Sequence, residues 1–326
     1  MKKIKLLISA PVEFLPDLKK KMIEEFDCIF SYGSDRTKTE KLLKENEFNA
    51  WLVSPCPTYF INSFILDLCP SLIMLSTPST GSNHLDVNYL KKKGIEFFSL
   101  KGTSVVDQIN ASSEFTFNLM ISTIRNTPFA YEAALDGNWR NIEHRFRGRE
   151  LNGLNLGIIG YGRIGKNLSR YSLSFGMKVI AYDPYIKIND PGVHQVPLID
   201  NLLTESDVIA VCVHLDEKTY KMMNDVVFNK MKNGVYFINT SRGDVVDENA
   251  LLKYLNNGKI KCAGLDVISD ELSGDVNDHP LVQYARDNDN LIITPHMAGL
   301  TFESEEKAQT AAFNAIRDYL KPTNKD

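Results

Sequence analysis

A glycine-rich loop in the middle of the chain is the feature that most constrains its fold. Gly160, Gly162 and Gly165 follow a short apolar run, and apolar residues at helical spacing come after them. This order predicts a buried strand, a tight turn and a helix. In such a loop the first glycine permits the turn, the second lets the backbone approach a pyrophosphate, and the third lets the helix lie close to the strand. The loop therefore predicts a dinucleotide site, to which Arg163 and Ile164 of the first helical turn also contribute.

An acidic residue after the next strand indicates which dinucleotide is bound. Residues 177–182 are predicted to form that strand, which delivers Asp183 to its carboxyl end. A carboxylate there accepts hydrogen bonds from the two ribose hydroxyls of NAD and would repel the 2′-phosphate of NADP. Pro184 and Tyr185 follow, and no arginine lies close enough in sequence to bind that phosphate. We therefore predict NAD as the cofactor.

Composition excludes several classes of protein. The chain has 326 residues, of which 43% are hydrophobic and 24% charged, as in an ordinary soluble globular protein with room for two domains. A net charge of -4 gives no reason to expect nucleic acid as a partner, and no apolar stretch approaches the length of a membrane span. The five cysteines are scattered, without a Cys-x-x-Cys pair, so we expect no metal site and no disulfide framework. These features predict a cytoplasmic protein with reduced thiols.

Apolar runs alternate with amphipathic helical stretches along most of the chain. This alternation predicts an α/β protein whose parallel sheets carry helices on both faces. The expected strands, beyond the two beside the glycine loop, are residues 5–9, 50–53, 72–76 and 96–99 before the loop, and 208–213, 235–239, 262–267 and 291–294 after it.

The glycine loop lies mid-chain, so a separate domain must precede it. The last helix has an apolar stripe that includes Ala308, Ala312 and Ile316, and we expect it to pack back on that first domain. The predicted division is therefore a discontinuous first domain of residues 1–101 plus 298–326 and an NAD-binding domain of residues 102–297.

The predicted helix at residues 111–125 is apolar on almost every side. A helix of this kind must be covered all round, by a second domain, a second subunit or both. We therefore expect a homodimer.

Polar residues follow four successive strands of the predicted second sheet. They are His214, Arg242, Asp266 and His296, and Glu271 lies on the loop that leaves the third of these strands. In an open parallel sheet, ligands bind outside the carboxyl ends of the strands. We therefore expect these side chains to meet at the same edge as the glycine loop.

At this point the sequence resembles a known family, the D-isomer-specific 2-hydroxyacid dehydrogenases. The resemblance runs roughly over residues 76–301 and includes, besides the glycine loop, Gly81-Ser82-Asn83-His84-Leu85-Asp86, Ile238-Asn239-Thr240-Ser241-Arg242-Gly243, Ala263-Gly264-Leu265-Asp266-Val267 and Ile293-Thr294-Pro295-His296. It implies a Rossmann-type cofactor domain inserted into a smaller flavodoxin-like substrate domain, both of them doubly wound parallel sheets.

The resemblance also implies roles for single residues. Arg242, Glu271 and His296 match the family's catalytic residues, and Asp266 matches the residue that holds the nicotinamide end of the cofactor. Thr240 and His214 are expected to line the cofactor site. Ser79, Thr80 and Gly81 match the loop whose backbone N–H groups bind the substrate carboxylate.

Physical chemistry supports the catalytic roles. Arg242 is always charged and fork-shaped, so it can bind a substrate carboxylate and carbonyl oxygen together. His296 can donate a proton to the oxygen as hydride arrives and take it back in reverse. Glu271, bonded to the other ring nitrogen, would orient His296 and favour its protonated form.

The identity of the substrate stays open at this level. Leu272 stands where the family usually has proline after the glutamate, and Pro55-Cys56-Pro57 replaces the polar residues usual on the facing lip. A basic cluster, made of Arg145, Arg147 and Arg149, is expected to be a solvated face; the alternative is a contact with a phosphorylated substrate or a partner subunit.

Several substrates and one other class of protein remain as alternatives. Phosphoglycerate, hydroxypyruvate or glyoxylate, and D-lactate are all possible, and a phosphoglycerate dehydrogenase ending at Asp326 is expected to lack a regulatory domain. An NAD-sensing corepressor is the alternative from another class, although such a protein need not keep the arginine, glutamate and histidine.

Overall fold

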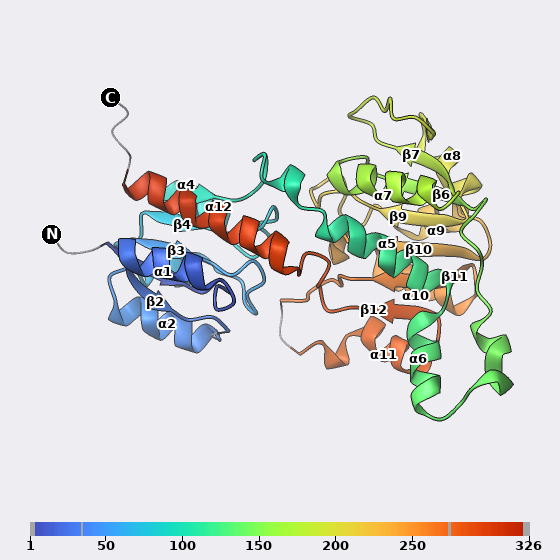
Figure 1. Cartoon of the computed structure of the whole chain (residues 1–326), viewed down its shortest axis with the longest axis horizontal. Helices are drawn as coiled ribbons and strands as arrows, with labels where there is room; N and C mark the ends of the chain where they lie inside the picture. The colour runs from blue at the N-terminus through green and yellow to red at the C-terminus, as the bar shows by residue number, and fades with distance from the viewer. Residues whose placement is uncertain (1–3, 34, 273–274, 322–326) are drawn as a thin grey trace. The chain divides into compact units, whose positions relative to one another are not determined.

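The structure, a computed structural model, describes residues 4–33, 35–272 and 275–321. These form two compact units (Figure 1). The first unit comprises the described parts of Met1–Ile109 and Thr301–Asp326, together with Leu272. The second comprises Asn110–Glu271 and Asp275–Leu300.

The first unit is built on a five-stranded parallel sheet. Its strand order is β2-β1-β3-β4-β5, which is the flavodoxin-like order. The strands are β1 (Lys5–Ile8), β2 (Asp27–Phe30), β3 (Ala50–Leu52), β4 (Met74–Ser76) and β5 (Glu96–Phe98).

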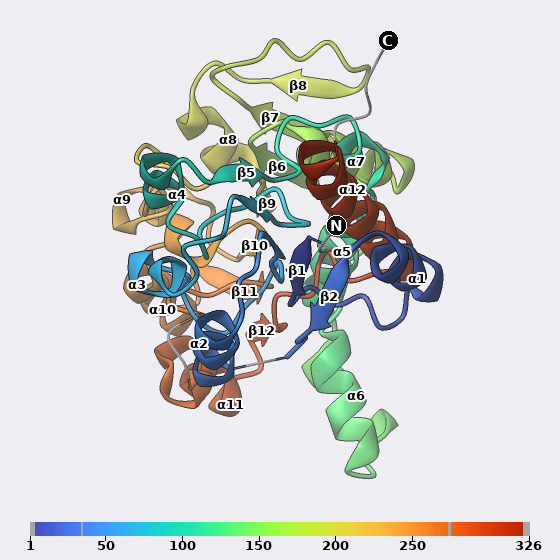
Figure 2. The same ribbon diagram turned by 90° about the vertical axis from the view of Figure 1, so that its left-hand side faces the viewer.

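Helices cover both faces of this sheet (Figure 2). On one face lie α1 (Pro16–Glu25) and α12 (Phe302–Leu320), whose Met22 and Phe313 pack with Leu6 of β1. The other face carries α2 (Arg36–Glu45), α3 (Ser63–Asp67) and α4 (Val87–Lys93). The hydroxyl of Ser76 donates a hydrogen bond to the carbonyl of Ala312 at 2.9 Å, so the last helix is fixed to the end of β4.

The second unit contains a seven-stranded parallel sheet. Its order is β12-β11-β10-β9-β6-β7-β8, so the strand order reverses between β6 and β9. This is the Rossmann order with one additional strand, and ligands bind at such a reversal. The strands are β6 (Asn155–Ile159), β7 (Lys178–Tyr182), β8 (Val193–Gln195), β9 (Val208–Val211), β10 (Val235–Asn239), β11 (Ile260–Leu265) and β12 (Leu291–Ile293).

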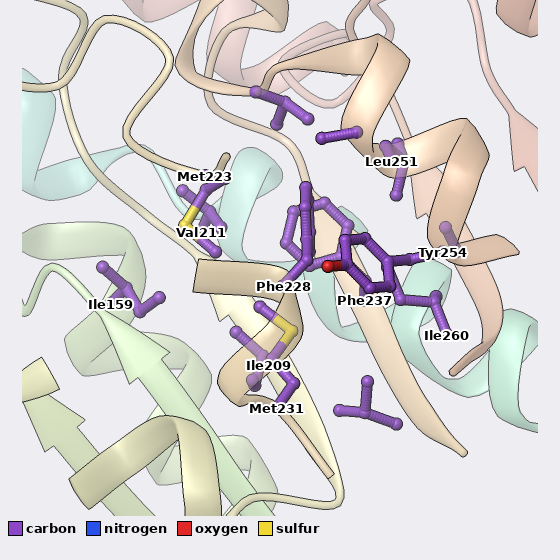
Figure 3. Close-up of a cluster of buried hydrophobic side chains, with 14 of the residues drawn as sticks. Ile159, Ile209, Val211, Met223, Phe228, Met231, Phe237, Leu251, Tyr254 and Ile260 are labelled. Atoms are coloured by element: carbon purple, nitrogen blue, oxygen red, sulfur yellow. The ribbon is translucent and has the colours of Figure 1, made fainter. Parts of the chain in front are cut away.

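Two groups of helices enclose this second sheet. α5 (Ala111–Ile124) and α7 (Arg163–Ser174) lie on one face, and α8 (Ile199–Glu205), α9 (Asp225–Lys230), α10 (Glu248–Asn256) and α11 (Pro280–Asp287) on the other. Under the second group, Phe228 of α9 contacts Phe237 of β10 edge-on with ring centroids 5.3 Å apart (Figure 3). α6 (Thr127–Leu135) runs away from the sheet and has no buried residue (Figures 1 and 2). Short 3-10 turns occupy η1 (Val106–Gln108), η2 (Arg140–Phe146), η3 (Gly243–Val245) and η4 (Val276–Asp278).

The predicted fold class, two doubly wound parallel α/β sheets, is confirmed. Every expected strand is present to within about two residues. Two strands were not expected, β2 and β8, and both lie at the edge of their sheet. Neither has a fully buried residue: β8 is mostly polar, and β2 has only the three apolar residues 28–30 after Asp27.

The expectation for the helix at residues 111–125 needs correction. α5 is covered within its own unit, because Leu119, Met120 and Ile124 are buried in the core beneath it. On its flank Phe117 meets Phe175 at a centroid distance of 4.9 Å. Its apolar composition is therefore explained without a second subunit.

The two units divide after Ile109 and after Leu300, whereas the sequence placed the divisions after residues 101 and 297. The segment before α5 joins the first unit because Ile109 packs with Leu100 and with Ala308 of α12. The assignment of substrate and cofactor roles to these units stays a prediction. No helix among the described residues has the length and apolar composition needed to cross a bilayer.

The five cysteines are thiols in different surroundings. Cys56 is exposed, Cys69 and Cys262 are buried, and Cys28 and Cys212 are partly buried. Loss of hydration raises the pKa of the Cys212 and Cys262 thiols to about 12, so little reactive thiolate forms there at neutral pH.

This difference predicts the order of alkylation. In the native protein at mildly alkaline pH, iodoacetamide should modify Cys56 first, and Cys212 and Cys262 should react only after unfolding. Peptide mass spectrometry over a time course measures the order. Labelling of Cys262 as fast as that of Cys56 in the folded protein would contradict the assigned burial.

Candidate cofactor and catalytic site

The three loop glycines are required for three different physical reasons. Gly160 has a φ of +89°, and a Cβ atom there would lie 2.7 Å from the carbonyl oxygen of Cys212. At Gly165 a Cβ would collide with the carbonyl oxygen of Gly160, so this glycine lets α7 lie against the turn. At Gly162 a Cβ would meet nothing within 4 Å. The second glycine therefore borders open space, as a site for a bulky group requires.

Asp183 is attached to this loop by backbone hydrogen bonds. Its Oδ2 accepts from the N–H of Tyr161 at 2.9 Å, and its Oδ1 accepts from the N–H of Tyr185 at 2.9 Å. The carboxylate is half-buried at the end of β7. Each carboxylate oxygen can accept more than one hydrogen bond, so acceptor capacity remains for a ligand. Arg163 and Ile164 are in the first turn of α7, directly after Gly162.

Two further residues expected in the cofactor site lie at the ends of β9 and β10. His214 is exposed beyond β9, and its carbonyl accepts a hydrogen bond from the hydroxyl of Thr219 at 2.6 Å. Thr240 is only 8% exposed, and its hydroxyl lies 2.7 Å from that of Thr116 on α5. The side chain of Thr240 thus ties the loop after β10 to α5.

Backbone hydrogen bonds join the loops that follow β10, β11 and β12. The N–H of Asp266 donates to the carbonyl of Asn239, and the N–H of His296 donates to the carbonyl of Asp266, both at 2.9 Å. The side-chain amide of Asn239 donates to the carbonyl of Arg242 at 3.0 Å. The sheet ladder therefore continues into the loops that carry the expected catalytic residues.

Gly243 brings the loop of Arg242 against the loop of Glu271. A Cβ atom at Gly243 would collide with the peptide between Ile268 and Ser269, which leaves no room for any other residue. The guanidinium of Arg242 donates one hydrogen bond from Nη1 to the carbonyl of Ser241 at 2.6 Å. This contact holds the side chain near its own loop while further N–H donors remain for a ligand.

His296 and Glu271 form a hydrogen-bonded pair. Nδ1 of His296 lies 2.8 Å from Oε1 of Glu271, and the two side chains are 33% and 21% exposed. Because a carboxylate only accepts, Nδ1 carries the proton and Nε2 faces away from Glu271. His296 itself has a φ of +51°, and Asp270 beside Glu271 has a φ of +53°. Such left-handed conformations cost about 1–3 kcal/mol each, so surrounding contacts must hold them.

Asp266 supplies contacts that hold the loop of His296. It is 1% exposed, and its Oδ1 accepts from the N–H of Met297 at 3.0 Å and from the hydroxyl of Thr294 at 2.6 Å. Its Oδ2 accepts from the N–H of Ala298 at 2.8 Å. Burial raises the pKa of Asp266 above its usual value, and these hydrogen bonds oppose that shift. The structure thus directs this carboxylate to the histidine loop.

Negative charge gathers beside Glu271. Burial raises the pKa of Asp244, and the nearby charges of Asp270 and Glu271 raise it further, against the opposing charge of Lys221. Among the described residues, no group of histidine, cysteine, aspartate or glutamate has the arrangement of a metal site.

The residues expected to bind the substrate carboxylate lie in the first unit, after β4. The hydroxyl of Ser79 donates to the carbonyl of Gly81 at 2.6 Å and lies 3.2 Å from the hydroxyl of Thr77. His84 is buried, and its Nε2 lies 3.3 Å from the same Thr77 hydroxyl. These contacts shape the turn, in which Thr80 and Gly81 are half-exposed.

The basic cluster consists of arginines that are already paired. Arg145 meets Asp289 at 2.6 Å, Arg147 meets Glu143 at 3.6 Å, and Arg149 meets Asp207 at 3.9 Å. These exposed pairs favour the solvated face over a contact with a phosphate group.

Sequence reasoning assigned no role to three residues that build this site. Asn239 holds the carbonyl of Arg242, Gly243 permits the close approach of two loops, and Glu248 of α10 binds Ser269 near Glu271. For Gly243 the residue type itself was a signal, since glycine is used where backbone segments approach closely. The roles of Asn239 and Glu248 depend on contacts that sequence spacing does not reveal.

Comparisons with known proteins agree with this geometry. Residues 117–298 match the family described as D-isomer specific 2-hydroxyacid dehydrogenase, NAD binding domain. The chain is 34% identical over 247 residues to a hydroxypyruvate reductase of Thermotoga maritima, covering 76% of this chain and 77% of the relative. It is 33% identical over 270 residues to a glyoxylate reductase of Thermofilum pendens, covering 78% and 74%.

A solved structure of similar fold is that of D-lactate dehydrogenase from Aquifex aeolicus with NAD and lactic acid. It superposes with a TM-score of 0.81 at 32% identity and covers 97% of this chain and 95% of the other. The matched segment covers more than half of the chain, and the glycine loop, Asp183, Arg242, Glu271 and His296 all lie within it. This protein is an NAD-dependent oxidoreductase that belongs to the family of D-isomer specific 2-hydroxyacid dehydrogenases.

Proposed function

We propose that the protein reduces a small 2-keto acid to the D-2-hydroxy acid, reversibly, with Arg242, Glu271 and His296 as its catalytic residues. The observation that carries this proposal is the joined set of loops after β10, β11 and β12, in which Nδ1 of His296 meets Glu271 at 2.8 Å. Three neighbouring strand ends then present a cation, a carboxylate and an imidazole at one edge of the sheet.

NAD fits the glycine loop. The open space at Gly162 admits the pyrophosphate, and the N-terminus of α7 favours its negative charge. Asp183 would hold the ribose hydroxyls with the acceptor capacity that its backbone contacts leave. The remainder of the cofactor site would be lined by His214, Thr240 and Asp266. Thr240 and Asp266 would act chiefly by holding the loops that surround the site. When bound, the reduced cofactor supplies the hydride.

Arg242 and His296 would have different roles toward the substrate, the first in binding and polarisation and the second in proton transfer. The guanidinium of Arg242 would bind the carboxylate and polarise the ketone. Nε2 of His296 would protonate the carbonyl oxygen during reduction and remove that proton during oxidation. Glu271 keeps the proton on Nδ1, so Nε2 is presented in a fixed orientation. Ser79, Thr80 and Gly81 of the first unit, the proposed substrate domain, would bind the carboxylate through backbone N–H groups.

A short keto acid without a phosphate is the proposed substrate. Relatives of similar length are named hydroxypyruvate reductase and glyoxylate reductase. Arg145, Arg147 and Arg149, which could have indicated a phosphorylated substrate, are paired with acidic residues. A D-3-phosphoglycerate dehydrogenase of Methanocaldococcus jannaschii is 30% identical over 98% of this chain, so the phosphorylated keto acid belongs among the compounds to be tested.

A steady-state assay tests the function. Glyoxylate, hydroxypyruvate, pyruvate and 3-phosphohydroxypyruvate are each supplied with NADH, and loss of nicotinamide absorbance is followed. Glyoxylate or hydroxypyruvate should give the highest kcat/KM. Arg242→Ala and His296→Ala should each lower kcat at least about a thousandfold, since each removes a group that acts in the transition state. NADH binding, measured by fluorescence titration, should survive in both.

Controls for this assay come from exposed positions. Arg36→Ala and His194→Ala remove the same types of side chain from the surface and should leave turnover unchanged. Retained turnover in both Arg242→Ala and His296→Ala would refute the catalytic assignment.

Two glycine substitutions should separate cofactor binding from folding. Gly162→Ala should leave the free energy of unfolding nearly unchanged, because its Cβ meets no neighbour, but should weaken NADH binding at least about tenfold by occupying the pyrophosphate space. Gly243→Ala should lower the free energy of unfolding by about 1–3 kcal/mol, because its Cβ collides with the backbone at Ile268. Chemical denaturation and fluorescence titration measure both. Unchanged NADH affinity in Gly162→Ala would place the pyrophosphate elsewhere.

We also propose that the protein is a homodimer, on grounds other than those of the sequence. α6 has no buried residue, and Tyr131, Leu135 and the following Trp139 are 64%, 70% and 74% exposed. Tyr131 and Leu135 lie about one helical turn apart on α6, and Trp139 lies beyond the end of the helix, after Gly137, so this apolar stripe is not covered by any of the described residues. A second copy of the stripe would provide that cover.

Light scattering should report a dimer at micromolar concentration. Leu135→Glu should shift the protein toward monomer, because it places a charge in the stripe. Leu198→Glu is the control: Leu198 is similarly exposed, directly before α8, and its substitution should leave the dimer intact. A wild-type monomer would contradict the proposal.

We also propose that the protein is located in the cytoplasm, where buried thiols such as Cys69 and Cys262 stay reduced.

A further inference from the structure

Glu248, in the first turn of α10, binds the residues on either side of the Glu271 loop. Its Oε1 accepts from the N–H of Ser269 at 2.7 Å, and its Oε2 accepts from the hydroxyl of Ser269 at 2.6 Å. The same Oε2 lies 3.3 Å from Nε2 of His279, and the side chains of Glu248 and His279 are 15% and 12% exposed. One largely buried carboxylate therefore joins a residue before Glu271 to a residue after it.

The orientation of His279 fixes which nitrogen faces this carboxylate. Nδ1 of His279 accepts a hydrogen bond from the N–H of Leu281 at 3.3 Å and so caps the start of α11. Because Nδ1 accepts, Nε2 carries the proton and donates toward Glu248. His279 thus ties the start of α11 to the start of α10.

The N-cap of α10 is a residue other than Glu248. Asp247 already caps α10, because its Oδ1 accepts from the N–H of Ala250 at 3.3 Å. Burying a carboxylate costs free energy unless hydrogen bonds compensate, and here the compensation comes from Ser269 and His279. Glu248 therefore contributes hydrogen bonds to the loop in addition to its favourable place at the N-terminus of α10.

Ser269 is confined from two directions just before Glu271. Glu248 binds its N–H and hydroxyl, and the backbone of Gly243 lies against its peptide. The next residue, Asp270, has the left-handed φ of +53°, and Glu271 follows with its carboxylate on Nδ1 of His296. A shift at Ser269 would thus pass directly to the Glu271–His296 pair.

We propose that Glu248 is a positioning residue for the reaction: through Ser269 and His279 it holds Glu271 on His296, without touching substrate or cofactor. This inference rests on the proposed function. It assigns to α10 the task of holding Glu271, which in turn orients the proton donor His296.

The test is a double-mutant cycle in the full-length protein. Glu248→Gln keeps the size of the side chain, but its amide N–H₂ group faces the N–H donors of Ser269 or His279. We expect kcat for the best keto acid to fall about tenfold or more, with KM and the NADH dissociation constant changed less than about twofold. In a Glu271→Gln background the same substitution should change kcat less than about twofold, because the group it positions is gone.

Two further variants serve as controls for Glu248→Gln. Asp278→Asn removes a carboxylate from an exposed position next to His279 and should leave kcat unchanged. His279→Asn preserves a capping side chain for α11 but is too short to reach Glu248, so it should lower kcat less than Glu248→Gln does. It replaces Glu248→Gln in the cycle if that variant loses its native circular dichroism.

The possible failures are distinguishable. Equal loss of kcat from Glu248→Gln in both backgrounds, or no loss in the wild-type background, overturns the positioning role and leaves the proposed function intact. Absence of turnover in the wild type with every keto acid, or undiminished turnover in Glu271→Gln, overturns the catalytic assignment and this inference with it.

Discussion

The hydrogen-bond ladder that continues beyond the strands of the second sheet is the constraint on which the site depends. Parallel strands end at one edge, but loops leaving them could still diverge. Here the N–H of His296 donates to Asp266 and the N–H of Asp266 donates to Asn239, so three loops stay in register. That register holds His296 in a left-handed conformation that an isolated loop would leave. The chemistry therefore relies on backbone geometry before any side chain acts.

The architecture, and the position of the candidate site residues after the strands of the second sheet, could be read from the sequence because both depend on local patterns. Buried parallel strands are continuous apolar runs, and β10 has the bounds that its run predicts. The glycines at 160, 162 and 165 report backbone constraints directly, and each meets the surroundings expected of it. The edge strands β2 and β8 were not predicted: β8 is mostly polar, and the apolar run of β2 is only three residues long.

Contacts between loops distant in sequence could not be read in this way. Asp266 was expected to hold the nicotinamide end of the cofactor, but sequence spacing did not reveal that its carboxylate accepts hydrogen bonds from the backbone N–H groups of Met297 and Ala298. Thr240 likewise bonds to α5. The apolar composition of α5 suggested a partner subunit, but the helix is buried by its own unit and α6 carries the exposed stripe. In each case the residue type was informative, whereas its partner was decided by tertiary packing.

The double attachment of Asp183 has a consequence for redesigning the enzyme to accept NADP. Its two oxygens accept from the backbone N–H groups of Tyr161 and Tyr185, so the residue proposed to select the ribose also holds the turn proposed to receive the pyrophosphate. Replacing Asp183 with a small or basic residue would remove the repulsion of the 2′-phosphate of NADP. The same change would leave two backbone N–H donors without an acceptor. A successful swap of coenzyme preference would therefore need a replacement acceptor, such as a serine hydroxyl or an asparagine carbonyl, at that corner.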